Sequence, residues 1–430
     1  MLKVGRSLLA SLALFAAAPG AASLHSRPDT NGDAAEARLR VVFESVRQGR
    51  TNAALDEVDR LIARYPNFRL AHLVRGDLLL ARAQPIGRFG NTGHAAPQRL
   101  EELRAEALAR MRGLREAPPA GAVPRHLLAL PPEQTHAIVV DASRSRVYVY
   151  ENNRELPRLV ADYYATLGKR GFDKLREGDQ KTPLGVYHVT STIPGGKLPD
   201  FYGWGALPIN YPNEWDRRLR KTGYGIWLHG VPSENYSRAP WASDGCIALA
   251  NDEIAELAKR VKPGATPVVI AERVEWVTPE TWRAERERFL RQLEAWRVDW
   301  ESRDAERYLS HYAREFQVGA TDLAAWSAHK RRVNASKAWI KVGLGNVSVL
   351  HAPGVQNVIE VVFEQDYRSS NLSQRTRKRQ YWVEEGGRWK IAYEDKVGGQ
   401  KLRLPESFKS TVRTNGVGGA FSVTKIEAAK

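Results

Sequence analysis

The sequence predicts a multidomain α+β protein with an N-terminal helical segment, a mostly-β central domain and a C-terminal α+β domain. The chain has 430 residues, more than a single compact core usually contains. Its apolar pattern changes from helical spacing to strand-like runs near residue 137, and returns to helical spacing near residue 281. A hydrophobic fraction of 43% and 12 tryptophans allow packed cores.

Residues 24–132 are predicted to form a helical domain and a linker. Apolar residues recur at helical spacing over 53–62 and over 70–80, and Tyr65-Pro66-Asn67 breaks the pattern between them. A helix, a proline-containing turn and a second helix resemble a tetratricopeptide unit. Only about one and a half such units are present, so we expect a packing or dimerising helical pair. The proline-rich stretch 118–132 is predicted to be the linker.

Residues 133–276 are predicted to form the mostly-β domain. A short polar turn separates two β-branched and aromatic runs, which indicates a hairpin. One helix is expected at 251–261, with Asp252 and Glu253 placed favourably for the helix dipole. The expected strands are 137–141, 146–150, 159–167, 185–191, 226–229 and 267–271.

Residues 277–430 are predicted to begin with two helices, over 282–300 and 304–316. Strands should follow at 338–342, 346–350, 358–365, 380–384 and 389–394. Two helices followed by a curved meander resemble the nuclear-transport-factor-like, or SnoaL-like, cone fold. Such a fold assigns no chemistry by itself, and this segment contains no acid–base set. We therefore expect a binding or packing module.

The first 23 residues are typical of a secretory signal peptide. Lys3 and Arg6 precede an apolar run over 8–18 and a group of small residues. The run is short for a bilayer span, so we expect no integral membrane span after cleavage and a periplasmic location. An uncleaved anchor is the alternative. The net charge of +16 suits anionic partners such as wall polymers or membrane surfaces, and solvated helix faces explain it equally well. No motif points to nucleic acid.

Cys246 is the single cysteine of the chain and cannot form an internal disulfide. A strand ending at 228 should deliver His229 and Gly230, and Cys246 should precede the helix near 251. A thiol near a helix N-terminus and an imidazole is pushed toward the reactive thiolate. Gly245 lets the backbone approach a substrate carbonyl, so the N–H groups of Gly245 and Cys246 are a candidate oxyanion hole.

Residues 137–271 resemble the L,D-transpeptidase (YkuD) catalytic domain. The family pattern is His-Gly followed by Ser/Thr-His-Gly-Cys, matched here by His229-Gly230 and Ser243-Asp244-Gly245-Cys246. Thr182-Pro183-Leu184-Gly185 matches the family's strand entry, and 203–213 resembles a branch with murein hydrolase-like members. The resemblance implies a peptidoglycan stem peptide as substrate, Cys246 as nucleophile and His229 as base. It also implies that the Gly230 carbonyl orients the base.

Two departures from the pattern put the acceptor in doubt. Asp244 replaces the usual histidine, and Ala248 or Leu249 stands where Asn or Arg often follows the cysteine. The resemblance favours an L,D-transpeptidase that passes the acyl group to an amine. The alternative is an L,D-carboxypeptidase that uses water, because the architecture also resembles the carboxypeptidases that set cell shape in helical bacteria. A wall-binding pseudoenzyme scaffold is the second alternative.

Four further residues are candidates for substrate binding, and each has a structural alternative. Aromatic core packing explains the tryptophans better than a peptide cleft does. An exposed acid beside a helix entry explains Asp244 equally well. No metal-ligand cluster is evident, and thiolate chemistry needs no cofactor. The four candidates are Ser243, Asp244, Trp204 and Trp241.

Overall fold

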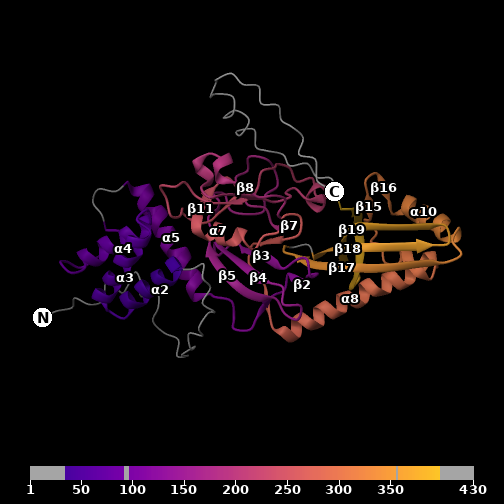
Figure 1. The fold of residues 1–430 in the computed structure, drawn as a ribbon, viewed down its shortest axis with the longest axis horizontal. Helices are drawn as coiled ribbons and strands as arrows, with labels where there is room; N and C mark the ends of the chain where they lie inside the picture. The colour runs from indigo at the N-terminus through magenta and orange to yellow at the C-terminus, as the bar shows by residue number, and fades with distance from the viewer. Residues whose placement is uncertain (1–33, 92–95, 355–356, 398–430) are drawn as a thin grey trace, which may run out of the picture.

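The computed structural model describes residues 34–91, 96–354 and 357–397. Its three parts follow one another along the long axis of the molecule: helices at one end, β-structure in the middle, and a sheet with a long helix at the other end (Figure 1). The predicted α+β class is confirmed. The predicted signal peptide lies outside the described residues.

The N-terminal part is a helical domain. The turn predicted at Tyr65-Pro66-Asn67 is confirmed, because one helix ends at Arg64 and the next begins at Arg69. Val58, Leu61 and Leu70 are fully buried between these helices. The helices are α2 (Ala34–Arg47), α3 (Thr51–Arg64), α4 (Arg69–Leu80) and α5 (Pro97–Arg115).

A five-stranded sheet supports the central domain. The predicted hairpin is confirmed as an antiparallel pair in which Ile138 faces Val149. Apolar side chains from both ends of the domain, such as Val140 and Ile270, are fully buried in one cluster. The strand order is β5-β4-β3-β13-β7, formed by β3 (His136–Asp141), β4 (Arg146–Glu151), β5 (Arg158–Tyr164), β7 (Gly185–His188) and β13 (Pro267–Ala271).

A second sheet of short strands, in the order β12-β10-β9-β8, carries His229 at the end of β10. Its members are β8 (Ile193–Pro194), β9 (Gly205–Pro208), β10 (Trp227–His229) and β12 (Ile247–Ala248). A separate pair joins β6 (Leu167–Gly168) to β11 (Trp241–Ser243). The helical elements here are η1 (Gly195–Lys197), η2 (Asp200–Tyr202), α6 (Glu214–Arg218) and α7 (Asn251–Ala258).

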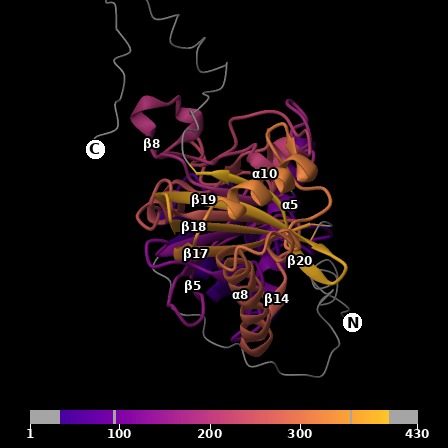
Figure 2. The same ribbon diagram turned by 90° about the vertical axis from the view of Figure 1, so that its right-hand side faces the viewer.

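The C-terminal part is a curved antiparallel sheet with a long helix along it (Figures 1 and 2). Trp296 of the helix and Trp382 of the sheet are completely buried in the same aromatic core. The helices are α8 (Pro279–Glu301), α9 (Ala305–Leu309) and α10 (Leu323–Ala335). The strands are β15 (Gln317–Val318), β16 (Thr321–Asp322), β17 (Ile340–Ala352), β18 (Val358–Ser369), β19 (Leu372–Glu385) and β20 (Arg388–Lys396).

Three local predictions for the C-terminal part need correction. The helix predicted over 304–316 ends at Leu309, because Ala313 and His311 exchange backbone hydrogen bonds with Ile391 of the sheet. The two strands predicted over 338–350 are one strand with a register shift between Gly345 and Ser348. Helix α10 was not predicted.

The stretch predicted as a linker contributes strands to two sheets. Within it, β1 (Val123–Pro124) pairs with β14 (Trp276–Val277), and β2 (Leu127–Ala129) is the edge strand beside β17. Leu127 belongs to a buried cluster that also contains Val139 and Leu350, so the central and C-terminal sheets share packing surface. The pairing partners lie far away in sequence, and a local pattern therefore cannot reveal them.

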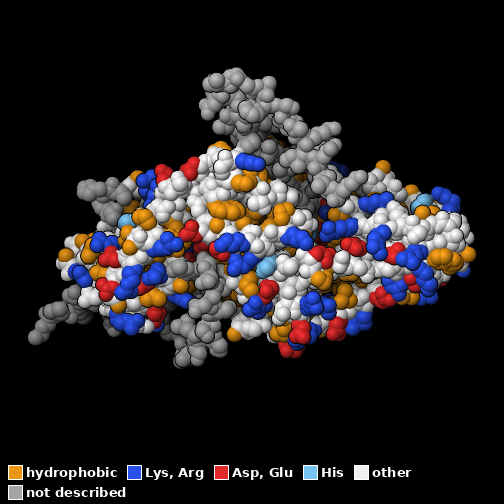
Figure 3. Space-filling model, viewed as in Figure 1, with side chains coloured by type: hydrophobic (Ala, Val, Ile, Leu, Met, Phe, Trp, Pro, Cys, Tyr) orange, Lys and Arg blue, Asp and Glu red, His pale blue; other side chains and the backbone are white. Residues whose placement is uncertain are grey.

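Basic side chains are spread over all three parts of the face shown in Figure 3, with acidic side chains among them. The net charge of +16 is thus not gathered into one patch on this face.

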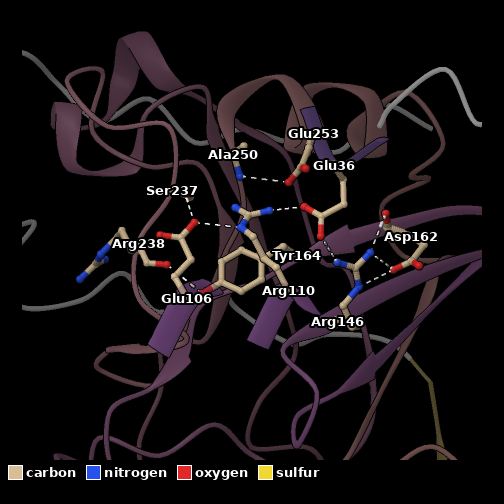
Figure 4. Close-up of polar contacts among 10 residues, drawn as sticks. All are labelled: Glu36, Glu106, Arg110, Arg146, Asp162, Tyr164, Ser237, Arg238, Ala250 and Glu253. Atoms are coloured by element: carbon tan, nitrogen blue, oxygen red, sulfur yellow. Dashed lines mark hydrogen bonds and ion pairs between the residues drawn. The ribbon is translucent and has the colours of Figure 1, made fainter. Parts of the chain in front are cut away.

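A buried charge network joins the helical domain to the central domain (Figure 4). Glu36 of α2 pairs with Arg110 of α5 and, at 2.9 Å, with Arg146 of β4. Arg146 also binds Asp162, and Arg110 binds Glu106 at 2.9 Å. Burial by itself would raise the pKa of Glu36, but the two guanidinium groups outweigh it and hold this pKa below its usual range. Glu36 is therefore ionised and shared by both domains.

Replacing Glu36 by glutamine is expected to lower the local stability of α2 by about 3 kcal/mol, because it leaves buried arginine charge without its partner. Hydrogen exchange measured by mass spectrometry should show faster exchange in α2 and α5 peptides. Glu44→Gln is the control, since Glu44 pairs with the half-exposed Arg47 and should change stability by less than about 0.5 kcal/mol. Unchanged exchange of α2 in Glu36→Gln would show that the network does not hold the domains together.

Candidate active site

His229 lies at the end of β10, between β9 and β12, and is 1% exposed. Its Nδ1 lies 2.6 Å from the carbonyl oxygen of Gly230. A carbonyl can only accept, so Nδ1 carries the proton and Nε2 presents a lone pair. The expected orientation of the imidazole by Gly230 is present in the structure.

Asn251, the first residue of α7, holds the loop that follows His229. Its Oδ1 accepts from the backbone N–H groups of Trp204, at 2.9 Å, and Val231, at 3.2 Å. Its Nδ2 donates to the Val231 carbonyl at 2.9 Å. A Cβ on Gly230 would collide with the same amide oxygen, so glycine is required there. Asn251 was not predicted as a site residue, although it stands at the predicted start of the helix that follows Cys246.

Cys246 directly precedes β12, which runs parallel to β10 with Leu228 opposite Ile247. This register brings Cys246 beside the strand that carries His229. The thiol is partly accessible at the surface, and Sγ lies 3.4 Å from the Gly225 carbonyl oxygen. Strand pairing thus brings the two residues of the motif to one place, although they are separated by a loop in sequence.

Burial sets the protonation of both groups, because a low-dielectric environment disfavours charge. Burial raises the pKa of Cys246 to about 11, and Asp244 adds to this while the Trp227 backbone N–H opposes it. Burial lowers the pKa of His229 to about 4. In this structure burial therefore favours the neutral thiol over the expected thiolate.

The loop of Ser243 and Gly245 shapes the backbone before Cys246. Gly245 has φ +122°, and a Cβ there would lie 2.6 Å from the Lys181 carbonyl oxygen. Its N–H donates to Ser243 Oγ at 3.1 Å, and that hydroxyl donates to the Cys246 carbonyl at 2.6 Å. We expected the Gly245 N–H to be an oxyanion donor. In the structure it donates to Ser243 instead and is not free for that role. Ser243 is 3% exposed and braces this loop.

Two aromatic residues of η2 cover His229. Tyr202 contacts the imidazole edge-on with ring centroids 5.1 Å apart, and Phe201 lies 5.9 Å from it. Burial raises the pKa of Tyr202, with a further contribution from Cys246. Neither aromatic residue was predicted, although both directly precede the Gly203-Trp204-Gly205 motif.

The remaining candidates lie at different depths around this centre. Trp204 is partly buried against the central core. Trp241 is 38% exposed and contacts the Phe172 ring. Asp244 is exposed and forms an ion pair with Lys169 at 2.9 Å. Of these three, Trp241 and Asp244 present side chains that a peptide could touch.

Across residues 34–91, 96–354 and 357–397, no three His, Cys, Asp or Glu side chains gather as a metal site would require. In the same ranges, no helix combines the length and the apolar character needed to cross a bilayer.

Comparison with known proteins identifies both domains that follow the helices. Residues 135–270 match the family model of the L,D-transpeptidase catalytic domain (YkuD), and 288–395 match that of the Cds6 C-terminal NTF2-like domain. Bd1075 from Bdellovibrio bacteriovorus is 30% identical, with a TM-score of 0.58, and the match covers 65% of this chain and 100% of Bd1075. The chain belongs to the L,D-transpeptidase (YkuD) family. The predicted family and the C-terminal nuclear-transport-factor-like fold are thus confirmed.

A second solved structure shares the fold of this L,D-transpeptidase family member. It is the helical cell shape determining protein Pgp2 from Campylobacter jejuni, at 24% identity and a TM-score of 0.54, covering 64% of this chain and 95% of Pgp2. No curated protein matches the chain. Both family models leave out residues 34–115, so the helical domain is an addition to the matched pair of domains.

The protonated thiol predicts a steep pH dependence of alkylation. Labelling of Cys246 by iodoacetamide should be slow at pH 7.5 and should rise about tenfold per pH unit toward the pKa of about 11. Intact-protein mass spectrometry measures this cleanly because the chain has one cysteine. Circular dichroism at each pH controls for unfolding. A rate that levels off below pH 8 would mean that the thiolate already forms at neutral pH.

Proposed function

We propose that this chain is a peptidoglycan L,D-transpeptidase in which Cys246 is the nucleophile and His229 the base. The observation that carries the proposal is the imidazole fixed through Nδ1 on the Gly230 carbonyl, one strand away from the thiol. Family membership supports peptidoglycan as the substrate. The N-terminal sequence supports a periplasmic location, where that substrate lies.

The first step is acylation of Cys246 by a stem peptide. Sγ attacks the carbonyl carbon of the third residue, a diamino acid, while the thiol proton moves to Nε2 of His229. The C–N bond to the fourth residue then breaks, and its nitrogen takes the proton from His229. D-Alanine leaves and a thioester remains on Cys246.

The second step regenerates the thiol. An amine from another stem peptide attacks the thioester, His229 takes a proton from the amine, and the sulfur leaves and recovers a proton. Water in place of the amine gives L,D-carboxypeptidation, the alternative function. A cleft of about 440 Å³, lined by Arg238 and Trp241 of the loop before Cys246, offers space for part of a peptide.

A neutral resting pair suits this sequence of proton transfers. With the pKa of His229 near 4, Nε2 is unprotonated and able to accept at neutral pH. With the pKa of Cys246 near 11, the sulfur becomes nucleophilic as its proton leaves. The Cys246 backbone N–H is our candidate oxyanion donor, and Ser243 supports it by fixing the loop.

The C-terminal domain is proposed to position wall or protein partners and to support the catalytic domain. Trp282 Nε1 donates to the Leu127 carbonyl at 2.8 Å, and β2 pairs with β17. Because these contacts bridge the two domains, removing the C-terminal domain would leave β2, which precedes β3 in the chain, without its partner strand β17. Its contribution is therefore best tested by point variants in the whole chain.

Cys246→Ala and His229→Ala should each reduce D-alanine release from a tetrapeptide muropeptide by a factor of about 10³ or more, because each removes a partner in the proton transfer. Mass spectrometry of the products also separates cross-linked dimers from tripeptides, and so decides between amine and water as acceptor. Circular dichroism controls for folding. Wild-type turnover in well-folded Cys246→Ala would end the catalytic proposal and favour a wall-binding scaffold.

A carbapenem should acylate Cys246 and add one lactam mass to the intact protein. Its strained carbonyl meets the same nucleophile and oxyanion donor as the peptide bond. The adduct should be lost in Cys246→Ala and form more slowly in His229→Ala. Iodoacetamide at high pH controls for access to the thiol; labelling without any lactam adduct would indicate an accessible cysteine that lacks acyl-transfer geometry.

A further inference from the structure

A polar cleft lies between α5 of the helical domain and residues 235–242 of the catalytic domain. Its volume is about 440 Å³. The helical domain contributes Arg69, Arg99, Glu102 and Glu106 to its lining. The catalytic domain contributes Lys169, Arg238 and Trp241. Residues 235–242 belong to the loop that connects His229 with Cys246, although neither of these two residues lines the cleft. We call it the α5 cleft.

Arg238 connects the α5 cleft with the catalytic pair. Its guanidinium lies over the Phe201 ring at 5.2 Å, and that ring contacts His229. Nη2 donates to the Ala242 carbonyl. Nη1 is buried and has no hydrogen-bond partner among the described residues. A buried N–H donor without a partner lowers the stability of the folded protein. This nitrogen is therefore a candidate donor to a ligand that accepts hydrogen bonds.

The helical domain fixes the chain directly before Arg238. Tyr236 packs against Tyr65 and Phe68, with ring centroids 4.8 and 4.4 Å apart. Ser237 donates to Glu106 of α5 at 2.6 Å (Figure 4). These contacts come from the domain that the family models leave out, so they add to the matched catalytic fold.

The charges of the cleft favour a ligand that carries a carboxylate. A guanidinium binds a carboxylate through charge-assisted hydrogen bonds. Arg69, Arg99 and Lys169 also line the cleft and make it basic overall. Glu106 is already paired with Arg110, so Glu102 is the carboxylate that can face the amine of a zwitterion. A D-amino acid is such a zwitterion, and the proposed reaction releases one beside this loop.

We propose that Arg238 binds the free α-carboxylate of the D-amino acid at the reacting amine, first on the leaving D-alanine and then on an incoming amine acceptor. This inference rests on the proposed function. It makes Arg238 a specificity-determining residue that selects peptides ending at the residue after the scissile bond. Ser237 and Glu106 act through Arg238 as positioning residues.

The test compares two tetrapeptide muropeptides, one with a C-terminal carboxylate and one with a C-terminal carboxamide. The wild type should prefer the carboxylate in kcat/KM by roughly 10- to 100-fold, the range of a hydrogen bond to a charged group. Arg238→Gln should lower the preference to within about threefold by slowing only the carboxylate substrate. Arg238→Lys should keep part of it, since the charge remains without the planar fork. Ser237→Ala should reduce it partially.

Arg170→Gln is the matched control, because Arg170 is an exposed arginine of the same domain and should leave the preference unchanged. An equal loss on both substrates in Arg238→Gln and Arg238→Lys would show a structural role and overturn the inference. A retained carboxylate preference in Arg238→Gln, or no preference in the wild type, would overturn it as well. If the wild type releases no D-alanine from either peptide, the proposed function fails instead.

Discussion

The parallel pairing of β10 with β12 is the constraint on which the candidate active site depends. Leu228 opposite Ile247 fixes the register, and this places His229 at the end of one strand and Cys246 at the start of its neighbour. A register is difficult to shift where side chains are buried, and Leu228 and Ile247 are completely buried. The geometry of the candidate site is therefore held by core packing, while the connecting loop can make other contacts.

The same packing determines the charge state of the site. Protein atoms around His229 and Cys246 remove water, which disfavours the imidazolium and the thiolate. In the proposed reaction, a neutral pair requires that proton transfer accompany attack on the carbonyl. The single hydrogen bond from Nδ1 to Gly230 then has a large effect, because it decides which imidazole nitrogen accepts the proton.

The helical domain contacts the loop between His229 and Cys246. Glu36 forms buried ion pairs with Arg110 and Arg146, which join the helical domain to the central domain. Glu106 of the same helix as Arg110 accepts a hydrogen bond from Ser237 of the loop. Buried charges pay for their desolvation only when they are well partnered, and burial does raise the pKa of Glu106 despite its contacts with Arg110 and Ser237. Such a network favours one defined placement of α5 against the loop, which gives the α5 cleft a fixed shape.

The sequence alone determined the fold class, the family and the pair of motif residues, because these follow from local patterns. Strand alternation predicted the hairpin of β3 and β4, and the spacing of His229-Gly230 and Ser243–Cys246 predicted the catalytic domain. Only the tertiary structure decided the protonation of Cys246, since that depends on which atoms surround the thiol. It also decided that β2 joins the C-terminal sheet and that Arg238 faces His229 through Phe201. These contacts join residues distant in the chain, and no local pattern records such neighbours.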